Sequence, residues 1–173
     1  MGSFTTLTAV DGFACPAYVA QPAGAPRGAI VVIQEIFGVN SHIRQVADRF
    51  AHYGYLAIAP ALFDLVRPGT ELGYDEAAVA RGRAIAEELG FDGALDGVRA
   101  AFDLASEENR VAAVGYCWGG SVAYYANARL GIPAVSYYGG RTVPLLRYRP
   151  KAPLMLHFGE HDALIPMDTV KRI

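Results

Sequence analysis

The feature of this sequence that most constrains its fold is a series of short apolar runs. The run Ala-Ile-Val-Val-Ile-Gln-Glu at 29–35 is rich in β-branched residues and stays apolar until its end. Such a run is typical of a strand that is buried on both faces. Comparable runs lie at 55–60, 110–116, 133–139 and 153–160. Together they predict the strands of one central sheet.

Segments with helical spacing separate these runs. Residues 41–54, for example, repeat apolar side chains at intervals of three and four positions and end at a glycine. Helices are expected at 41–54, 75–89, 92–106 and 118–130, and a last one from Pro166. This alternation indicates an α/β protein with a mostly parallel central sheet and helices on both faces. We find no repeat or linker, so residues 1–173 are expected to form a single domain.

Composition excludes several classes of function. The formal net charge is −2 and no basic stripe is present, which argues against nucleic acid as a partner. No apolar run approaches the roughly 20 residues that span a bilayer, and no secretory leader is recognised. We therefore expect a cytoplasmic protein without membrane association. The two cysteines, Cys15 and Cys117, lie far apart and outside any C-x-x-C pattern, so neither a disulfide framework nor a metal site is expected.

Three chemically active side chains follow predicted strands directly. They are Glu35, Cys117 and Asp162. Ligand sites of parallel sheets gather at the carboxyl ends of the strands. We therefore expect these three side chains to lie along one rim of the sheet.

Cys117 lies in a glycine-framed turn, Gly115-Tyr-Cys-Trp-Gly119, between a predicted strand and a predicted helix. The pattern G-x-C-x-G matches the nucleophile elbow G-x-S-x-G. The turn is so tight that side chains at the two glycine positions would collide with neighbouring backbone. The helix N-terminus would favour the thiolate, and the Trp118 amide would be placed to donate to an oxyanion. The simpler alternative is a buried cysteine in a packed turn, the structural role that we expect for Cys15 in an early edge segment.

Four motifs together resemble the dienelactone hydrolase family. They are Gln-Glu-Ile-Phe-Gly-Val-Asn at 34–40, Gly-Tyr-Cys-Trp-Gly-Gly at 115–120, Ser-Tyr-Tyr-Gly-Gly at 136–140 and His-Phe-Gly-Glu-His-Asp at 157–162. The resemblance covers essentially the whole chain. It implies an α/β-hydrolase fold with a Cys-His-Asp triad. It also implies cofactor-free opening of unsaturated cyclic esters, such as dienelactone to maleylacetate in the degradation of aromatic compounds.

The resemblance assigns roles to individual residues of this sequence. Cys117 resembles the nucleophile, Asp162 the acid that orients the triad histidine, and Glu35 a carboxylate that helps to activate the thiol when substrate binds. The backbone amides of Ile36 and Trp118 match the oxyanion hole. The substrate is accordingly expected to be a small lactone or ester, with a carboxylate group.

Residues expected to bind that substrate match the family less tightly. Tyr137 matches an active-site tyrosine, and Arg81 or Arg83 is the candidate for holding the substrate carboxylate. Simpler structural roles exist for these charged residues: a salt bridge or helix cap for Glu35, a turn cap for Asp162, and a solvated helix face for the arginines.

The catalytic histidine of the family has no counterpart in this sequence. It comes on a loop after the triad acid, followed by a closing helix, whereas this chain stops at Ile173. None of His42, His52, His157 and His161 occupies the equivalent place. We therefore expect the last strand and helix of the domain to be missing. Three explanations fit this pattern. The chain is a fragment with a complementing C-terminal piece, a truncated relative covered by a partner or by self-association, or a non-catalytic ligand-binding remnant.

Two hypotheses about function follow. The first is a cysteine hydrolase of small lactones or esters. The second is a ligand-binding or thiol-sensing relative that uses Cys117 without hydrolysis. A carboxylate at Glu35 would disfavour a resting thiolate, which suits a substrate-triggered hydrolase better than a sensor.

Overall fold

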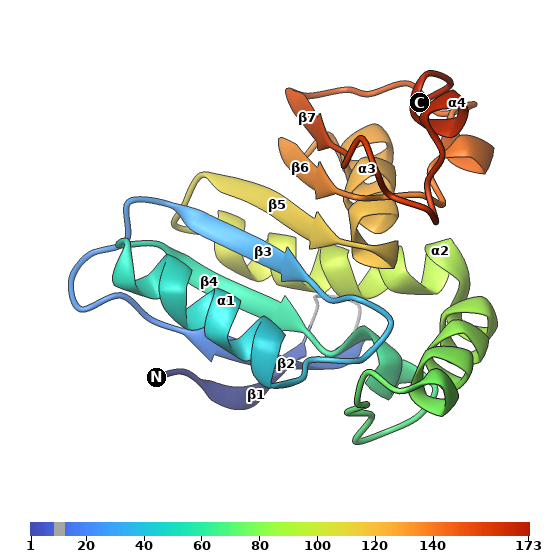
Figure 1. Cartoon of the computed structure of the whole chain (residues 1–173). Coiled ribbons are helices and arrows are strands. Elements are labelled where there is room, and N and C mark those ends of the chain that lie inside the picture. Colours follow the sequence, from blue (N-terminus) through green and yellow to red (C-terminus); the bar gives the residue numbers. More distant parts are fainter. Residues whose placement is uncertain (9–12) are drawn as a thin grey trace.

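A parallel sheet with an antiparallel flank organises the chain. The computed structural model describes residues 1–8 and 13–173, in which seven strands form one sheet in the order β1-β2-β4-β3-β5-β6-β7 (Figure 1). The strands are β1 Ser3–Thr8, β2 Ala14–Ala20, β3 Ala29–Ile33, β4 Leu56–Pro60, β5 Val111–Tyr116, β6 Ala134–Tyr137 and β7 Leu154–His157. The helices are α1 Ser41–His52, η1 Leu62–Leu65, α2 Glu76–Ser106, α3 Trp118–Leu130, η2 Val143–Leu145 and α4 Met167–Val170.

Strands β3 to β7 pair in parallel, as the apolar runs predict. The two N-terminal strands pair antiparallel, β1 with β2 and β2 with β4. The sequence pattern did not reveal them as strands. The expectation that Cys15 lies in an edge segment is wrong, because β1 pairs along β2 and itself forms the edge. The structural role of Cys15 agrees with its position, since its side chain is fully buried.

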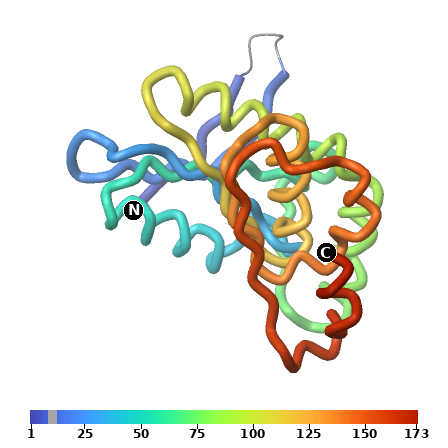
Figure 2. The backbone as a smooth tube through the Cα atoms, turned by 90° about the horizontal axis from the view of Figure 1, so that it is seen from above, coloured from blue at the N-terminus to red at the C-terminus, as the bar shows by residue number. Residues whose placement is uncertain are grey.

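Helices cover the two faces of the sheet and create two apolar cores. Helix α1 lies on one face, and α2 and α3 lie on the other (Figure 2). The smaller core joins α1 to the sheet through Ile43 and Ala47, and the larger joins α2 and α3 through Val98 and Val122. The prediction of helices on both faces is therefore confirmed. No helix in the described part of the chain is long and apolar enough to cross a membrane.

Helix α2 contains the break that the sequence pattern predicts. Gly90 has φ 67° and ψ 176°, so the element consists of two helical segments that meet at this residue. The prediction of helices at 75–89 and 92–106 is met within one or two residues. Three predicted strands, in contrast, extend beyond the observed ones at their carboxyl ends, because residues 34–35, 138–139 and 158–160 have left the sheet. The predicted strands at 55–60 and 110–116 end where the observed ones end.

Candidate active site

Cys117 lies in a strained turn at the carboxyl end of β5. It is the N-cap residue of α3, with φ 57° and ψ −123°. A non-glycine residue rarely adopts a positive φ, and such strain is concentrated at functional sites. A Cβ atom at Gly115 would overlap the carbonyl oxygen of Gly119, and one at Gly119 would overlap that of Gln34. The steric reason for the two glycines of the motif is therefore confirmed.

The environment of the thiol favours its protonated form. Burial raises the pKa of Cys117, and the nearby Glu35 and Asp162 carboxylates raise it further. A hydrogen bond from the Trp118 amide and the positive charge of Arg83 lower this pKa, but they do not outweigh burial. The helix N-terminus therefore acts in the expected direction without producing a resting thiolate. These interactions also place Glu35, Arg83 and Asp162 at the same rim as the sulfur.

Glu35 follows β3 and is half-buried. Its Oε1 accepts a hydrogen bond from the Tyr138 hydroxyl at 3.1 Å. Burial and the Glu35 charge both raise the pKa of Tyr138, so the phenol stays protonated and remains a donor. The salt bridge considered as the simpler role of Glu35 is absent from the described residues, and the partner of this costly carboxylate is instead a neutral hydroxyl.

Gln34 fixes the backbone beneath this carboxylate. Its side chain is fully buried, accepts from the Leu62 amide at 3.0 Å and donates to the Glu35 carbonyl at 3.3 Å. The next amide along, that of Ile36, has no protein acceptor within residues 1–8 and 13–173. Sequence reasoning did not single out Gln34, although a polar residue directly after a buried apolar strand is a recognisable signal.

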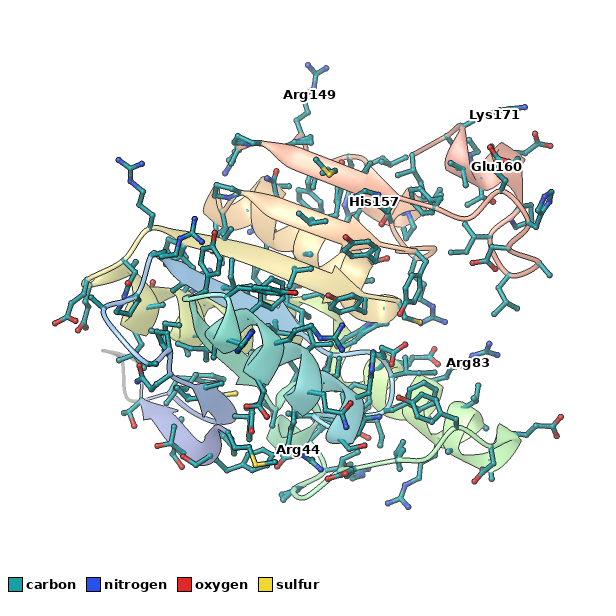
Figure 3. The ribbon with its side chains drawn as sticks, turned by 60° about the vertical axis from the view of Figure 1, so that its left-hand side comes forward. Arg44, Arg83, Arg149, His157, Glu160 and Lys171 are labelled. Atoms are coloured by element: carbon teal, nitrogen blue, oxygen red, sulfur yellow. The ribbon has the colours of Figure 1, made fainter. Side chains whose placement is uncertain are left out.

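The two candidate arginines lie on the first segment of α2. Both are exposed, and the positive charge of Arg83 lowers the pKa of Cys117. Gly82 between them packs on the Ile36 carbonyl, where a Cβ atom would overlap the oxygen. Figure 3 shows Arg83 extending from α2 at the end of the molecule where the loop with Glu160 also lies. The geometry therefore favours Arg83 over Arg81 as a group that can meet a bound anion.

Asp162 lies in the loop after β7. Its Oδ1 accepts from the Leu164 amide at 2.8 Å, and its carbonyl accepts from Ile165 at 3.2 Å. The turn-capping role is therefore real, but it leaves the second carboxylate oxygen available. His161 beside it is exposed. All four histidines of the chain are exposed.

The side chains of Tyr137 and Trp118 both pack against other aromatic rings. The Tyr137 ring stacks between Tyr116 (5.3 Å between ring centroids) and His157 (4.6 Å), on the α1 side of the sheet. Its neighbour Tyr138 is the tyrosine that reaches Glu35. A substrate-binding role for Tyr137 stays a prediction. The Trp118 ring is buried among Phe63 and Phe91, so only its backbone is available to the site.

Metal ligands do not accumulate at this rim. No group of three His, Cys, Asp or Glu side chains in the described part of the chain could hold a metal ion. The arrangement offers a nucleophilic sulfur, a carboxylate beside it and backbone donors. These are components of acyl-transfer chemistry.

Comparison with known proteins gives a consistent match. The family model described as the dienelactone hydrolase family matches residues 15–173. A carboxymethylenebutenolidase of Pseudomonas putida is 32% identical over 169 residues, which cover 93% of this chain and 72% of the relative. The carboxymethylenebutenolidase of Pseudomonas knackmussii matches with the same identity and coverage.

Solved structures agree at the level of the fold. A crystal structure from Klebsiella pneumoniae subsp. pneumoniae, which bears the provisional name dienelactone hydrolase, aligns with a TM-score of 0.81 and 26% identity. The alignment covers 99% of this chain and 78% of that one. An α/β serine hydrolase without a lid from Xanthomonas campestris aligns with a TM-score of 0.64 at 15% identity, which shows a shared fold alone.

Proposed function

The chain belongs to the dienelactone hydrolase family of carboxylic ester hydrolases, and from this premise we propose that Cys117 is the nucleophile that opens a small lactone or ester. The observation that carries the proposal is the positive φ of 57° at Cys117, in a turn that glycines alone permit. Such strain separates the sulfur from the sheet and leaves it accessible to a carbonyl carbon.

The reaction starts from a protonated thiol. The Cys117 proton passes to the Glu35 carboxylate as the sulfur attacks the carbonyl carbon, and the carbonyl oxygen becomes an oxyanion. The Ile36 and Trp118 amides donate to that oxyanion. The carbon–oxygen single bond of the ester then breaks, its oxygen takes the proton back from Glu35, and an acyl thioester remains on Cys117. Water hydrolyses the thioester and restores the thiol.

Arg83 supplies the basis for substrate selection in this proposal. Its guanidinium acts on the Cys117 sulfur and is exposed to solvent, so it can pair with a carboxylate on a bound ester. The Pseudomonas relatives are named for a lactone that bears a carboxymethylene group. We therefore assign a carboxylate-bearing lactone to this site, with Tyr137 as a secondary candidate for contact with it.

We assign no residue of this chain as the base that activates water for hydrolysis of the thioester. Asp162 would orient a histidine, but we assign this role to none of the four exposed histidines of the chain, because in the described residues no side-chain hydrogen bond or ion pair joins one of them to Asp162. The 173-residue chain should therefore form the acyl thioester more readily than it hydrolyses it. Losing one member of a triad costs several powers of ten in rate.

Acylation with p-nitrophenyl acetate tests the proposal. We expect one nitrophenolate per chain in a burst, and the mass of one acetyl group on the peptide that contains Cys117. Cys117→Ala should abolish both signals, whereas Cys15→Ala should leave them unchanged, because Cys15 is fully buried. Acetyl transfer without a label on Cys117 would contradict the assignment of the nucleophile.

The thiol-sensing alternative requires a thiolate at neutral pH. The environment of Cys117 acts in the other direction, since burial and the Glu35 and Asp162 carboxylates raise its pKa. Hydrogen peroxide should therefore oxidise this thiol no faster than it oxidises free cysteine. Rapid formation of a sulfenic acid at neutral pH would favour the sensor.

A further inference from the structure

Tyr138 is held in a backbone conformation that its side chain does not favour. Its φ is 41°, and it is the second non-glycine residue with a positive φ in the described residues, beside Cys117. Its amide donates to the His157 carbonyl at 2.7 Å, and its carbonyl accepts from the Gly140 amide at 2.9 Å. The surrounding structure therefore imposes the strain from both sides, which is the pattern of a residue whose direction matters.

The strain directs the phenol toward Glu35. The two residues are 103 positions apart in the sequence, and their side chains meet at 3.1 Å between Oη and Oε1. Hydrogen bonds to a carboxylate are stronger than neutral ones and fix the orientation of the group. One oxygen of Glu35 is thereby engaged, and no ion pair in the described residues competes for the carboxylate.

We propose that Tyr138 is a positioning residue, whose hydroxyl holds the Glu35 carboxylate against the Cys117 thiol. The inference rests on the proposed roles of Glu35 and Cys117 and adds the group that couples them. A carboxylate anchored at one oxygen presents its charge to the sulfur from a fixed direction. Without the hydroxyl, the flexible glutamate side chain would turn toward solvent, where its charge is screened.

The neighbouring tyrosine cannot replace this interaction. The Tyr137 ring stacks on Tyr116 and His157 on the α1 side of the sheet. Residue 138, in contrast, has left the strand, and its hydroxyl reaches Glu35 just after β3. The positioning role therefore depends on the turn after β6 and not on the stacked pair.

The rate of Cys117 alkylation by iodoacetamide, measured against pH, tests the inference without requiring turnover. The measurement uses a Cys15→Ala background, so that one thiol is followed. The charges that act on this thiol are Glu35 after β3, Arg83 on α2 and Asp162 after β7. Because the Glu35 charge raises the thiol pKa, Glu35→Gln should accelerate alkylation at pH 7.5, by roughly three- to tenfold for a shift of half to one pKa unit.

Tyr138→Phe should accelerate alkylation at the same pH by a smaller factor, about twofold, because the released carboxylate acts on the sulfur less strongly. In the Glu35→Gln background, Tyr138→Phe should change nothing, since its effect passes through the charge of Glu35. Glu35→Asp should resemble Tyr138→Phe, because the shorter carboxylate loses the same hydrogen bond. This variant provides a second route if Tyr138→Phe does not fold.

Tyr124→Phe is the matched control. It removes another partly buried tyrosine hydroxyl, which donates to the Tyr148 carbonyl at 2.9 Å, and should leave alkylation unchanged. The inference is overturned if Tyr138→Phe reproduces the wild-type profile while Glu35→Gln shifts it, or if its effect is equally large in both backgrounds. A Glu35→Gln variant with the wild-type profile would instead overturn the proposed coupling of Glu35 to Cys117.

Discussion

Single buried polar residues determine where the backbone of the rim lies. Gln34 is the clearest case, because its side-chain oxygen accepts from the Leu62 amide at the start of η1 and its side-chain nitrogen donates to the Glu35 carbonyl. A buried amide group without a partner is costly. The position of Glu35 and Ile36 therefore depends on a residue that takes no part in the proposed chemistry.

Gln34→Leu should lower the free energy of unfolding by about 1–3 kcal/mol, because the buried Leu62 amide loses its acceptor. Urea denaturation followed by circular dichroism measures the change. Gln45→Leu on the exposed face of α1 is the matched control and should stay within about 0.5 kcal/mol of wild type. Equal stability of Gln34→Leu and Gln45→Leu would show that the Gln34 bonds contribute nothing.

The two candidate arginines of α2 are expected to differ in their effect on the pKa of Cys117. Arg83 lowers the pKa of Cys117, so Arg83→Leu should raise that pKa and slow alkylation at pH 7.5 by about twofold. Arg81→Leu should have a smaller effect, because Arg83 and not Arg81 is among the main charges that act on the thiol. The alkylation rates of the two variants in the Cys15→Ala background decide between them. A slower rate in Arg81→Leu alone would reverse the assignment.

At the scale of elements, the break in α2 sets the direction of the segment that carries Arg83. Gly90 provides a positive φ, and Phe91 directly after it stacks on Trp118, the residue after Cys117. The first segment of α2 then packs on the rim through Gly82. The elbow, the break and the candidate anion-binding arginine are therefore parts of one packed arrangement.

Gly90→Ala should destabilise the protein by about 1–2 kcal/mol, because an L-residue disfavours the left-handed conformation that φ 67° requires. Space is not the obstacle, since a Cβ atom here would meet nothing within 4 Å. Gly24→Ala has equally open surroundings without a positive φ and serves as the control in thermal unfolding. If both variants unfold alike, Gly90 is not under conformational constraint.

Most of the strands and helices could be predicted from the sequence. Strands β3 to β7 and helices α1 and α3 follow from uninterrupted apolar runs and helical spacing, because buried parallel strands have an unmistakable composition. Strand β1 is mostly exposed and offers no such run, so its pairing with β2 depends on tertiary contacts. The contact between Tyr138 and Glu35 was not predicted for a related reason. The residue at which β6 ends decides which tyrosine meets Glu35, and strand ends are the least predictable feature.

At the scale of the whole molecule, the site depends on the ends of several strands. Cys117 follows β5, Glu35 follows β3, and Tyr138 follows β6 and is anchored to the carbonyl at the end of β7. Strands β3 and β5 lie at the centre of the sheet with helices on both faces. Strand β7 pairs only with β6 in the described sheet, and Met155 on it is 57% exposed. The proposed nucleophile is therefore built on buried central strands, and the anchor of the proposed positioning residue is built on a more exposed strand.

Amide hydrogen exchange measured by mass spectrometry should report this difference. Peptides from β3 and β5 should exchange at least about a hundredfold more slowly than peptides from β7, because local opening requires less free energy where fewer apolar contacts are broken. Strand β1, the other edge, is exposed on most of its residues and should also exchange fast. Since the Tyr138 amide donates to the end of β7, its protection should follow β7 and not β6. Equal protection of β7 and β3 would mean that β7 opens only when the whole sheet unfolds, and the Tyr138 anchor would then be as rigid as the turn that holds Cys117.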